Sequence, residues 1–84
     1  MKPTHVKLYS TTTCPYCMME KTWLDDEKID HEVVYVDQNQ EEAQKIVDKT
    51  EQMGVPVTEI SFENGKTEFV VGFNKPILAQ ILKA

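Results

Sequence analysis

The sequence contains no arginine, and its nine lysines are outnumbered by fourteen acidic residues. The net charge of −5 and the lack of any clustered basic stretch argue against nucleic acid as a partner. No apolar run approaches the ~20 residues of a membrane helix, and the first residues lack the apolar core and cleavage site of a signal peptide. We therefore expect a cytoplasmic, monomeric protein with no nucleic-acid or membrane partner.

Cysteine is also scarce, because the chain has only Cys14 and Cys17, in the stretch TTTCPYCMMEK. Structural disulfides are rare in the cytosol, where glutathione and thioredoxin keep thiols reduced. The pair is therefore a redox couple, half of a metal site, or two inert buried thiols. A zinc site needs four ligands, and no spacing brings His5 or His31 to this stretch. We favour the redox couple and expect no bound metal or other resident cofactor.

The 84 residues predict a single domain, residues 1–84, of the α/β class. Alternating and β-branched stretches predict strands at 5–10, 31–37, 55–62 and 66–72, and apolar periodicity predicts helices at 15–28, 40–53 and 74–84. Asn64-Gly65 predicts a type I′ hairpin turn, Asn74 an N-cap and Gly54 a helix end. The order βαβαββα predicts a four-stranded mixed sheet with helices on both faces.

Each predicted helix has an apolar side that we expect to pack on the sheet. These inward positions are Met18, Met19, Trp23 and Leu24 in the first helix, Ala43, Ile46 and Val47 in the second, and Ile77, Leu78, Ile81 and Leu82 in the third. The acidic clusters Asp25-Asp26-Glu27 and Glu41-Glu42 are typical of solvated helix faces.

The two cysteines fall at the start of the first helix, Cys14 at its N-cap and Cys17 three residues later. Their side chains share a face, ~5–6 Å apart at Cβ, and a small adjustment brings them to the ~3.8 Å of a disulfide. Unpaired backbone N–H groups and the helix dipole favour the thiolate of Cys14, which ends a loop, whereas Cys17 points into the first turn. We expect Cys14 to attack a substrate disulfide and Cys17 to resolve the mixed disulfide. Pro15 stiffens the turn, and Tyr16 offers a flat apolar surface beside the sulfur.

The stretch GVPV places Pro56 at the start of a predicted strand. One interpretation is an ordinary strand-start proline. The other is a cis Val55–Pro56 bond beside the cysteines, which would leave the N–H and C=O groups of Val55 to pair with an extended substrate. We favour the cis bond.

Glu20 lies one turn beyond Cys17 on the same helix. The interpretation that we favour is a surface acid at the edge of the helix face. The alternative is a partly buried carboxylate that accepts the proton of Cys17 during resolution.

Three stretches in this order, LYSTTTCPYCMMEK, GVPV and VVGFNK, resemble the glutaredoxin family over nearly the whole chain. The resemblance implies the thioredoxin fold, a cis Pro56, and a thiol–disulfide oxidoreductase of electron transport and cell redox homeostasis with Cys14 as nucleophile and Cys17 as resolving thiol. It implies protein disulfides or glutathione mixed disulfides as substrates, with glutathione as co-substrate. The implied substrate or glutathione contacts are Thr11, Thr13, Pro15, Tyr16, Val55, Pro56, Gly72, Phe73 and Asn74.

Two positions depart from the family pattern. Glutaredoxins typically carry a lysine three residues before the first cysteine, where this chain has Thr11, and acids after the last strand, where it has the run Gly72-Phe73-Asn74-Lys75-Pro76. Weaker glutathione binding follows, and we favour protein disulfides as substrates.

The Gly-Phe pair of that run resembles NrdH-type redoxins, which take electrons from thioredoxin reductase and serve ribonucleotide reductase. The implied reductant is therefore thioredoxin reductase or the glutathione system, and an NrdH-like electron donor is an alternative function. A further alternative is a module that holds an iron–sulfur cluster or a metal through Cys14.

Overall fold

The computed structural model describes residues 3–51 and 55–82, and it contains one four-stranded sheet. The strands are β1 (Pro3–Ser10), β2 (Glu32–Tyr35), β3 (Val57–Phe62) and β4 (Thr67–Val71). The helices are α1 (Pro15–Asp26), α2 (Gln40–Thr50) and α3 (Lys75–Leu82), with a 3-10 turn, η1 (Val36–Gln38), after β2. The strand order is β2-β1-β3-β4, with β1 and β2 parallel and the other two pairs antiparallel. The predicted element order and the mixed sheet are confirmed.

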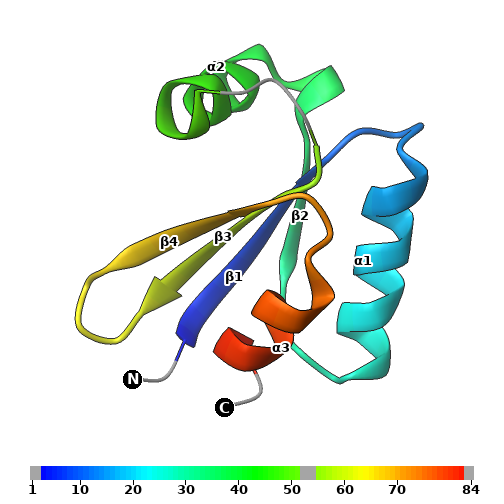
Figure 1. Ribbon diagram of the computed structural model, residues 1–84. Helices are drawn as coiled ribbons and strands as arrows, with labels where there is room; N and C mark the ends of the chain where they lie inside the picture. Colours follow the sequence, from blue (N-terminus) through cyan, green and yellow to red (C-terminus); the bar gives the residue numbers. More distant parts are fainter. Residues whose placement is uncertain (1–2, 52–54, 83–84) are drawn as a thin grey trace.

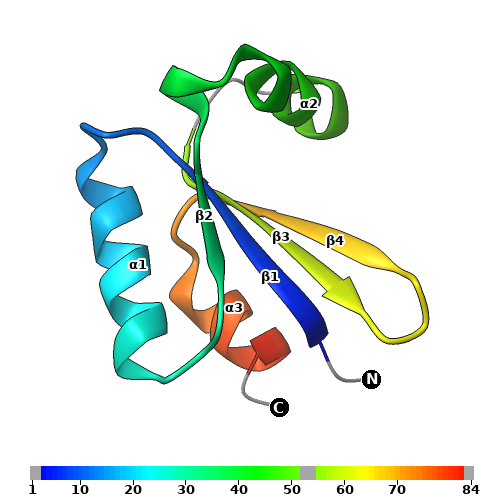
Figure 2. The ribbon, with the colours of Figure 1, turned by 180° about the vertical axis from the view of Figure 1, so that it is seen from behind.

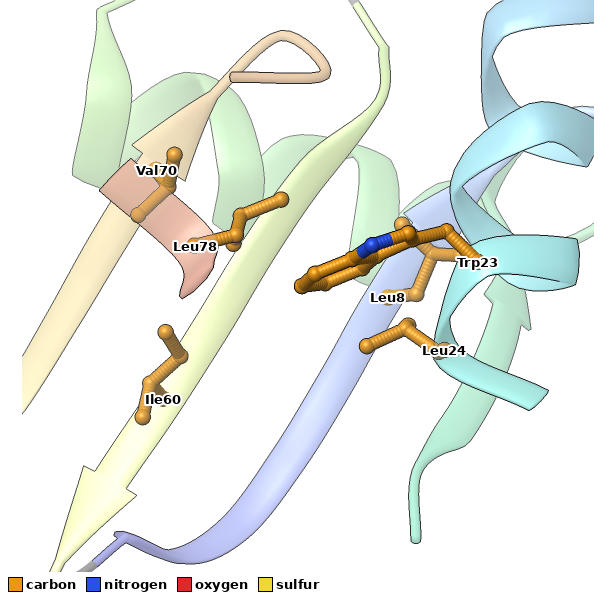
Figure 3. Packing of buried hydrophobic residues seen from close by; sticks show 6 residues of the cluster. All are labelled: Leu8, Trp23, Leu24, Ile60, Val70 and Leu78. Atoms are coloured by element: carbon orange, nitrogen blue, oxygen red, sulfur yellow. The ribbon is translucent and has the colours of Figure 1, made fainter. Parts of the chain in front are cut away.

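The helices cover both faces of the sheet, as expected: α1 and α3 lie on one side and α2 on the other (Figures 1 and 2). Successive side chains of a strand point to opposite faces, so adjacent residues of β1 enter different cores. Leu8 packs on the α1 and α3 side, and Tyr9 packs on the α2 side. The first core contains Leu8, Trp23, Leu24, Ile60, Val70 and Leu78 (Figure 3), and the second contains Tyr9, Ile46 and Val57.

Three positions that we expected to face inward are exposed instead. Met18 and Met19 on α1 keep 63% and 54% of their surface exposed, and Ile77 on α3 keeps 43%. The buried side of α1 runs through Cys17, Glu20 and the Trp23-Leu24 pair, and residues a third of a turn away point to solvent. The prediction for the two methionines was wrong because it was based only on the hydrophobicity of their side chains.

Two helices end earlier than the sequence predicted, because each turns into left-handed backbone. After α1, Lys28 has φ +56°, its N–H donates to Asp25 O at 3.1 Å, and the N–H of Ile29 donates to Leu24 O at 2.9 Å. This is a Schellman arrangement formed without glycine. After α2, Glu51 has φ +59°, and the predicted helix end at Gly54 lies outside the described residues.

The hairpin between β3 and β4 differs from the predicted type I′ turn, which would require positive φ at both central residues. Gly65 has φ +86°, but Asn64 is not in the left-handed region. The N–H of Gly65 donates to Phe62 O at 3.0 Å, and Asn64 Oδ1 accepts from the N–H of Lys66 at 3.1 Å. The loop is therefore a β-turn followed by a left-handed glycine, one residue longer than predicted.

Candidate redox site

Cys14 is the N-cap of α1, as the sequence predicted. Its backbone is extended, with φ −90° and ψ 112°, and its sulfur accepts a hydrogen bond from the N–H of Cys17 at 3.3 Å. Pro15 occupies the first helical position, where an N–H would lack an intrahelical partner. The sulfur of Cys14 thus lies at the open N-terminus of a helix, partly exposed to solvent.

Cys17 is buried, with 1% of its surface exposed, which confirms that it is the less accessible thiol. Burial, and secondarily the neighbouring Cys14 sulfur, raise the pKa of the Cys17 thiol from 9.0 to about 11. Both cysteines are free thiols in this structure. The two sulfurs therefore differ in accessibility. An external disulfide can reach the sulfur of Cys14, whereas the buried sulfur of Cys17 can reach only its neighbour.

The Val55–Pro56 segment closes the other side of the site. The bond between these residues is cis, as expected. The Cys14 sulfur lies 4.0 Å from Val55 O, and Pro56 O accepts a hydrogen bond from the N–H of Gly72 at 2.8 Å. Through these contacts the start of α1, the segment before β3 and the loop after β4 meet at one place.

The loop after β4 leads into α3 through Asn74. The N–H of Ile77 donates to Asn74 Oδ1 at 3.3 Å, so Asn74 is the N-cap that the sequence predicted. Phe73, the residue between Gly72 and the cap, is half-buried, and its ring packs on Trp23 of α1 with centroids 6.3 Å apart. Gly72, Phe73 and Asn74, three of the expected substrate contacts, therefore form one wall next to the Val55–Pro56 segment.

A groove of about 380 Å³ runs along α1 next to this wall. It is lined by Met18, Met19, Thr22, Trp23, Asp26, Phe73 and Lys75. Tyr16, 64% exposed, adds a further apolar side chain beside Cys14. The part of α1 that follows Cys14 therefore exposes three large apolar side chains, those of Tyr16, Met18 and Met19.

The expected contacts of the β1–α1 loop are placed differently. Thr11 lines a second pocket, against Ser10, Thr12 and Cys17 on the β2 side of α1, and it is not among the groove residues. Thr13 and Pro15 are exposed beside Cys14. The structure thus places Thr11 with Cys17 on one flank of α1, and Phe73 with Met18, Met19 and Trp23 in the groove on the other flank.

Asp37 is a site residue that sequence reasoning missed. Its Oδ2 accepts from both the N–H and the hydroxyl of Thr12, at 3.1 and 2.7 Å. The Thr12 hydroxyl and N–H lower the pKa of Asp37. This contact ties the loop that carries Cys14 to η1, and the signal in the sequence was an acid directly after a β-branched run.

Glu20 is fully buried, with 0% of its surface exposed, so its interpretation as a surface acid is wrong. The hydroxyl of Thr58, on β3, donates to Glu20 Oε2. Burial raises the pKa of Glu20 from 4.5 to about 7, against the lowering effect of the Thr58 hydroxyl. Sequence reasoning failed here because acids at this level of burial are rare and Thr58 is far away in the chain.

Within residues 3–51 and 55–82, no three or more His, Cys, Asp or Glu side chains gather in a group that could hold a metal ion. In the same residues, no helix combines the length and the apolar character needed to cross a membrane.

Comparison with known proteins gives consistent matches. A sequence model of the Glutaredoxin family matches residues 6–63. An uncharacterized glutaredoxin-like 8.6 kDa protein of the rubredoxin operon of Clostridium pasteurianum is 33% identical over 78 residues, which cover 93% of this chain and 97% of the relative.

Solved structures agree with these matches. The glutaredoxin of Archaeoglobus fulgidus superposes with a TM-score of 0.80 at 24% identity, covering 95% of this chain and 87% of that chain. A wheat glutaredoxin superposes with a TM-score of 0.66 at 23% identity, covering 89% of this chain and 68% of that chain. At these identities the two structures show a common fold, the thioredoxin-like fold.

Proposed function

Because the chain belongs to the glutaredoxin family, we propose that it is a dithiol–disulfide oxidoreductase in which Cys14 is the nucleophile and Cys17 the resolving thiol. The observation that carries this proposal is the inequality of the two sulfurs. Cys14 is partly exposed at the N-cap of α1, and Cys17 is buried behind it. An attacking thiol must be accessible, whereas a resolving thiol needs access only to the mixed disulfide.

The reaction has two exchange steps. In the first, the Cys14 thiolate attacks one sulfur of the substrate disulfide, an S–S bond to Cys14 forms, and the other substrate sulfur leaves as a thiolate with the electron pair. In the second, the Cys17 sulfur attacks Cys14 Sγ, and the first substrate sulfur leaves. The substrate gains two electrons, and the protein is left with a Cys14–Cys17 disulfide that a reductase must reduce.

Protein disulfides are the substrates that this surface favours. Tyr16, Met18 and Met19, which follow Cys14 in the first two turns of α1, are each more than half exposed, and large apolar side chains at a surface are typical of protein-binding sites. The backbone of Val55, beside the cis Pro56, offers a place for an extended segment of the substrate.

Glutathione is the weaker candidate, as a co-substrate. Its charged ends would meet Thr11 on one side and the run Gly72-Phe73-Asn74-Lys75 on the other, and neither place offers the charge that glutaredoxins typically carry there. Each missing charge-assisted hydrogen bond corresponds to roughly 1.5–3 kcal/mol, so two correspond to about 100-fold in affinity or more. The same argument favours thioredoxin reductase over the glutathione system as the reductant, as in an NrdH-like electron donor.

Two single variants test the assignment. Cys14→Ser should abolish the reduction of a protein disulfide such as insulin, because no other accessible thiolate replaces it. Cys17→Ser should instead retain the substrate as a mixed disulfide on Cys14, seen as a mass increase that a reducing agent removes. Trapping on Cys17 in the Cys14→Ser variant, with none in the Cys17→Ser variant, would reverse the two roles.

The reductant is tested by supplying the oxidised protein with either of two systems, NADPH with thioredoxin reductase or NADPH with glutathione and glutathione reductase. Faster consumption of NADPH with thioredoxin reductase is the expected result. We place the activity in the cytoplasm, where the two thiols would be kept reduced.

A further inference from the structure

Resolution requires the loss of a proton from Cys17, and bulk water is poorly placed to receive it. The side chain is 1% exposed, and its burial raises the pKa of the thiol to about 11. A thiol attacks a disulfide as the thiolate. A proton acceptor inside the protein would therefore accelerate this step at neutral pH.

Glu20 offers such an acceptor on the buried side of α1. The hydroxyl of Thr58 donates to its Oε2, and its Oε1 has no hydrogen-bond partner within residues 3–51 and 55–82. One carboxylate oxygen is thus held in position, and the other keeps the lone pairs that can take a proton.

Helix geometry directs this carboxylate toward Cys17. Residues three apart share a helix face, and helical side chains lean toward the N-terminus, so we expect the side chain of Glu20 to extend over the turn that carries Cys17. On the sheet side, the hydroxyl of Thr58 fixes the carboxylate of Glu20 by a hydrogen bond. Thr58 lies two residues after the cis Pro56 that flanks Cys14. The carboxylate is therefore anchored to β3 on the buried side of α1, one helical turn from the resolving cysteine.

Few other ionisable groups act on Glu20. The residues of β1, β3 and β4 on the α1 and α3 side include Leu8, Ser10, Thr58, Ile60 and Val70, none of which carries a charge. On β2 the residues that face this side are Val33 and the exposed Tyr35. On this face β4 also carries Glu68, which is exposed, and α3 packs inward with Leu78. On the buried side of α1 the other ionisable residue is Cys17. Lys21 is exposed and pairs with Asp25.

We propose that Glu20 is the proton acceptor of the resolving step: its unpartnered oxygen, one turn from Cys17 and anchored by Thr58, takes the thiol proton as Cys17 attacks the mixed disulfide. The proton passes from Cys17 Sγ to Glu20 Oε1, directly or through one water. The Cys17–Cys14 bond forms, the bond from Cys14 to the substrate sulfur breaks, and that sulfur leaves with the electron pair. The proton then reaches the departing thiolate or solvent. This inference rests on the proposed function.

The pKa of Glu20, raised to about 7, suits this role, because the carboxylate can accept a proton at neutral pH and return it without a large cost. In single turnover, the reduced protein is mixed with excess nitrobenzoate disulfide, whose first coloured thiolate reports attack by Cys14 and whose second reports resolution. The wild-type rate of resolution should rise with pH through an inflection near 7 and then level off.

Glu20→Gln keeps the size of the side chain and an oxygen for Thr58, but it cannot take the proton. This variant should lose the inflection and resolve about 100-fold more slowly above pH 7, the usual effect of a general base, while the attack phase is unchanged. Thr58→Val removes the hydroxyl that lowers the pKa of Glu20, so it should move the inflection to higher pH. Glu59→Gln is the matched control, because Glu59 also accepts from a hydroxyl, that of Tyr9, on the opposite face of the sheet.

The outcomes separate the two proposals. If the wild-type protein releases no second thiolate, the proposed dithiol function fails. If resolution occurs but shows no inflection near pH 7, or if Glu20→Gln resolves as fast as the wild type or faster, the role of Glu20 is overturned and the dithiol function stands.

Discussion

At position 20 the chain keeps a carboxyl group where α1 faces the sheet, and the protonation of that group is linked to stability. The pKa of Glu20 in the folded protein is about 7, against 4.5 without the fold, because burial disfavours the charged form. The folded state therefore binds this proton more tightly than the unfolded state. The resulting contribution to stability is fully present below pH 4.5 and is lost as the pH rises through 7.

Replacing Glu20 by glutamine should remove this pH dependence. Each tenfold difference in proton affinity corresponds to about 1.4 kcal/mol, so the wild-type protein should lose about 3 kcal/mol relative to Glu20→Gln between the two pKa values, 4.5 and 7. Urea unfolding of both proteins at several pH values measures the difference. A difference that stays constant across this window would show that Glu20 is not titrating in the fold.

At the scale of the elements, two helices begin in the same way. Asn39 Oδ1 accepts from the N–H of Glu42 at 3.2 Å at the start of α2, and Asn74 Oδ1 accepts from the N–H of Ile77 at 3.3 Å at the start of α3. Only the second cap adjoins the redox site, because Asn74 follows the Gly72 that is hydrogen-bonded to Pro56. Comparing the two N-caps therefore separates the contribution of a cap to stability from its effect on function.

Asn39→Ala and Asn74→Ala should each lower the free energy of unfolding by about 1 kcal/mol, the usual cost of losing an N-cap. Only Asn74→Ala should also slow the reduction of a protein disulfide, because it loosens the wall that carries Phe73. Chemical denaturation and turnover assays on the two variants give both quantities. Equal losses of activity would mean that the cap of α3 affects the site through stability alone.

The type and order of the elements could be predicted from the sequence, but their ends could not. Alternation in β1 and the caps at Cys14 and Asn74 are local signals, and these predictions are confirmed. The early end of α1 depends on left-handed backbone at Lys28, and no glycine at this position indicated it in the sequence. The predicted type I′ turn required a positive φ at Asn64. The Asn-Gly pair favours that value, but Asn64 does not adopt it in the fold.

At the scale of the whole molecule, the site combines local and distant contacts, and only the local part was predictable in detail. The proposed roles of Cys14 and Cys17 rest on their place at one helix start, and both the GVPV stretch and the family resemblance predicted the cis bond at Pro56. The hydrogen bond from Thr58 to Glu20 and the contact of Asp37 with Thr12 join residues 38 and 25 positions apart, which no local pattern reveals. The exposed methionines likewise depend on how α1 is rotated on the sheet.

The rotation of α1 that exposes Met18 and Met19 leads to a prediction about substrate size. Met18→Ser with Met19→Ser should lower kcat/KM for a protein disulfide roughly 30-fold, because two apolar contacts of about 1 kcal/mol each would be lost. The same variant should reduce a small disulfide at the wild-type rate. Ile77→Ser is the control, because it removes an exposed apolar side chain outside the groove. Equal loss with both substrates would place the methionines in the chemistry and not in partner binding.

The packing of Trp23 against Phe73 also gives the molecule a spectroscopic property. The sequence contains a single tryptophan, so all indole fluorescence comes from one position. That indole is 8% exposed, lines the groove along α1 and lies 6.3 Å from the Phe73 ring. A partner that fills the groove changes the surroundings of this one chromophore, so its emission reports occupancy of the site without any added label.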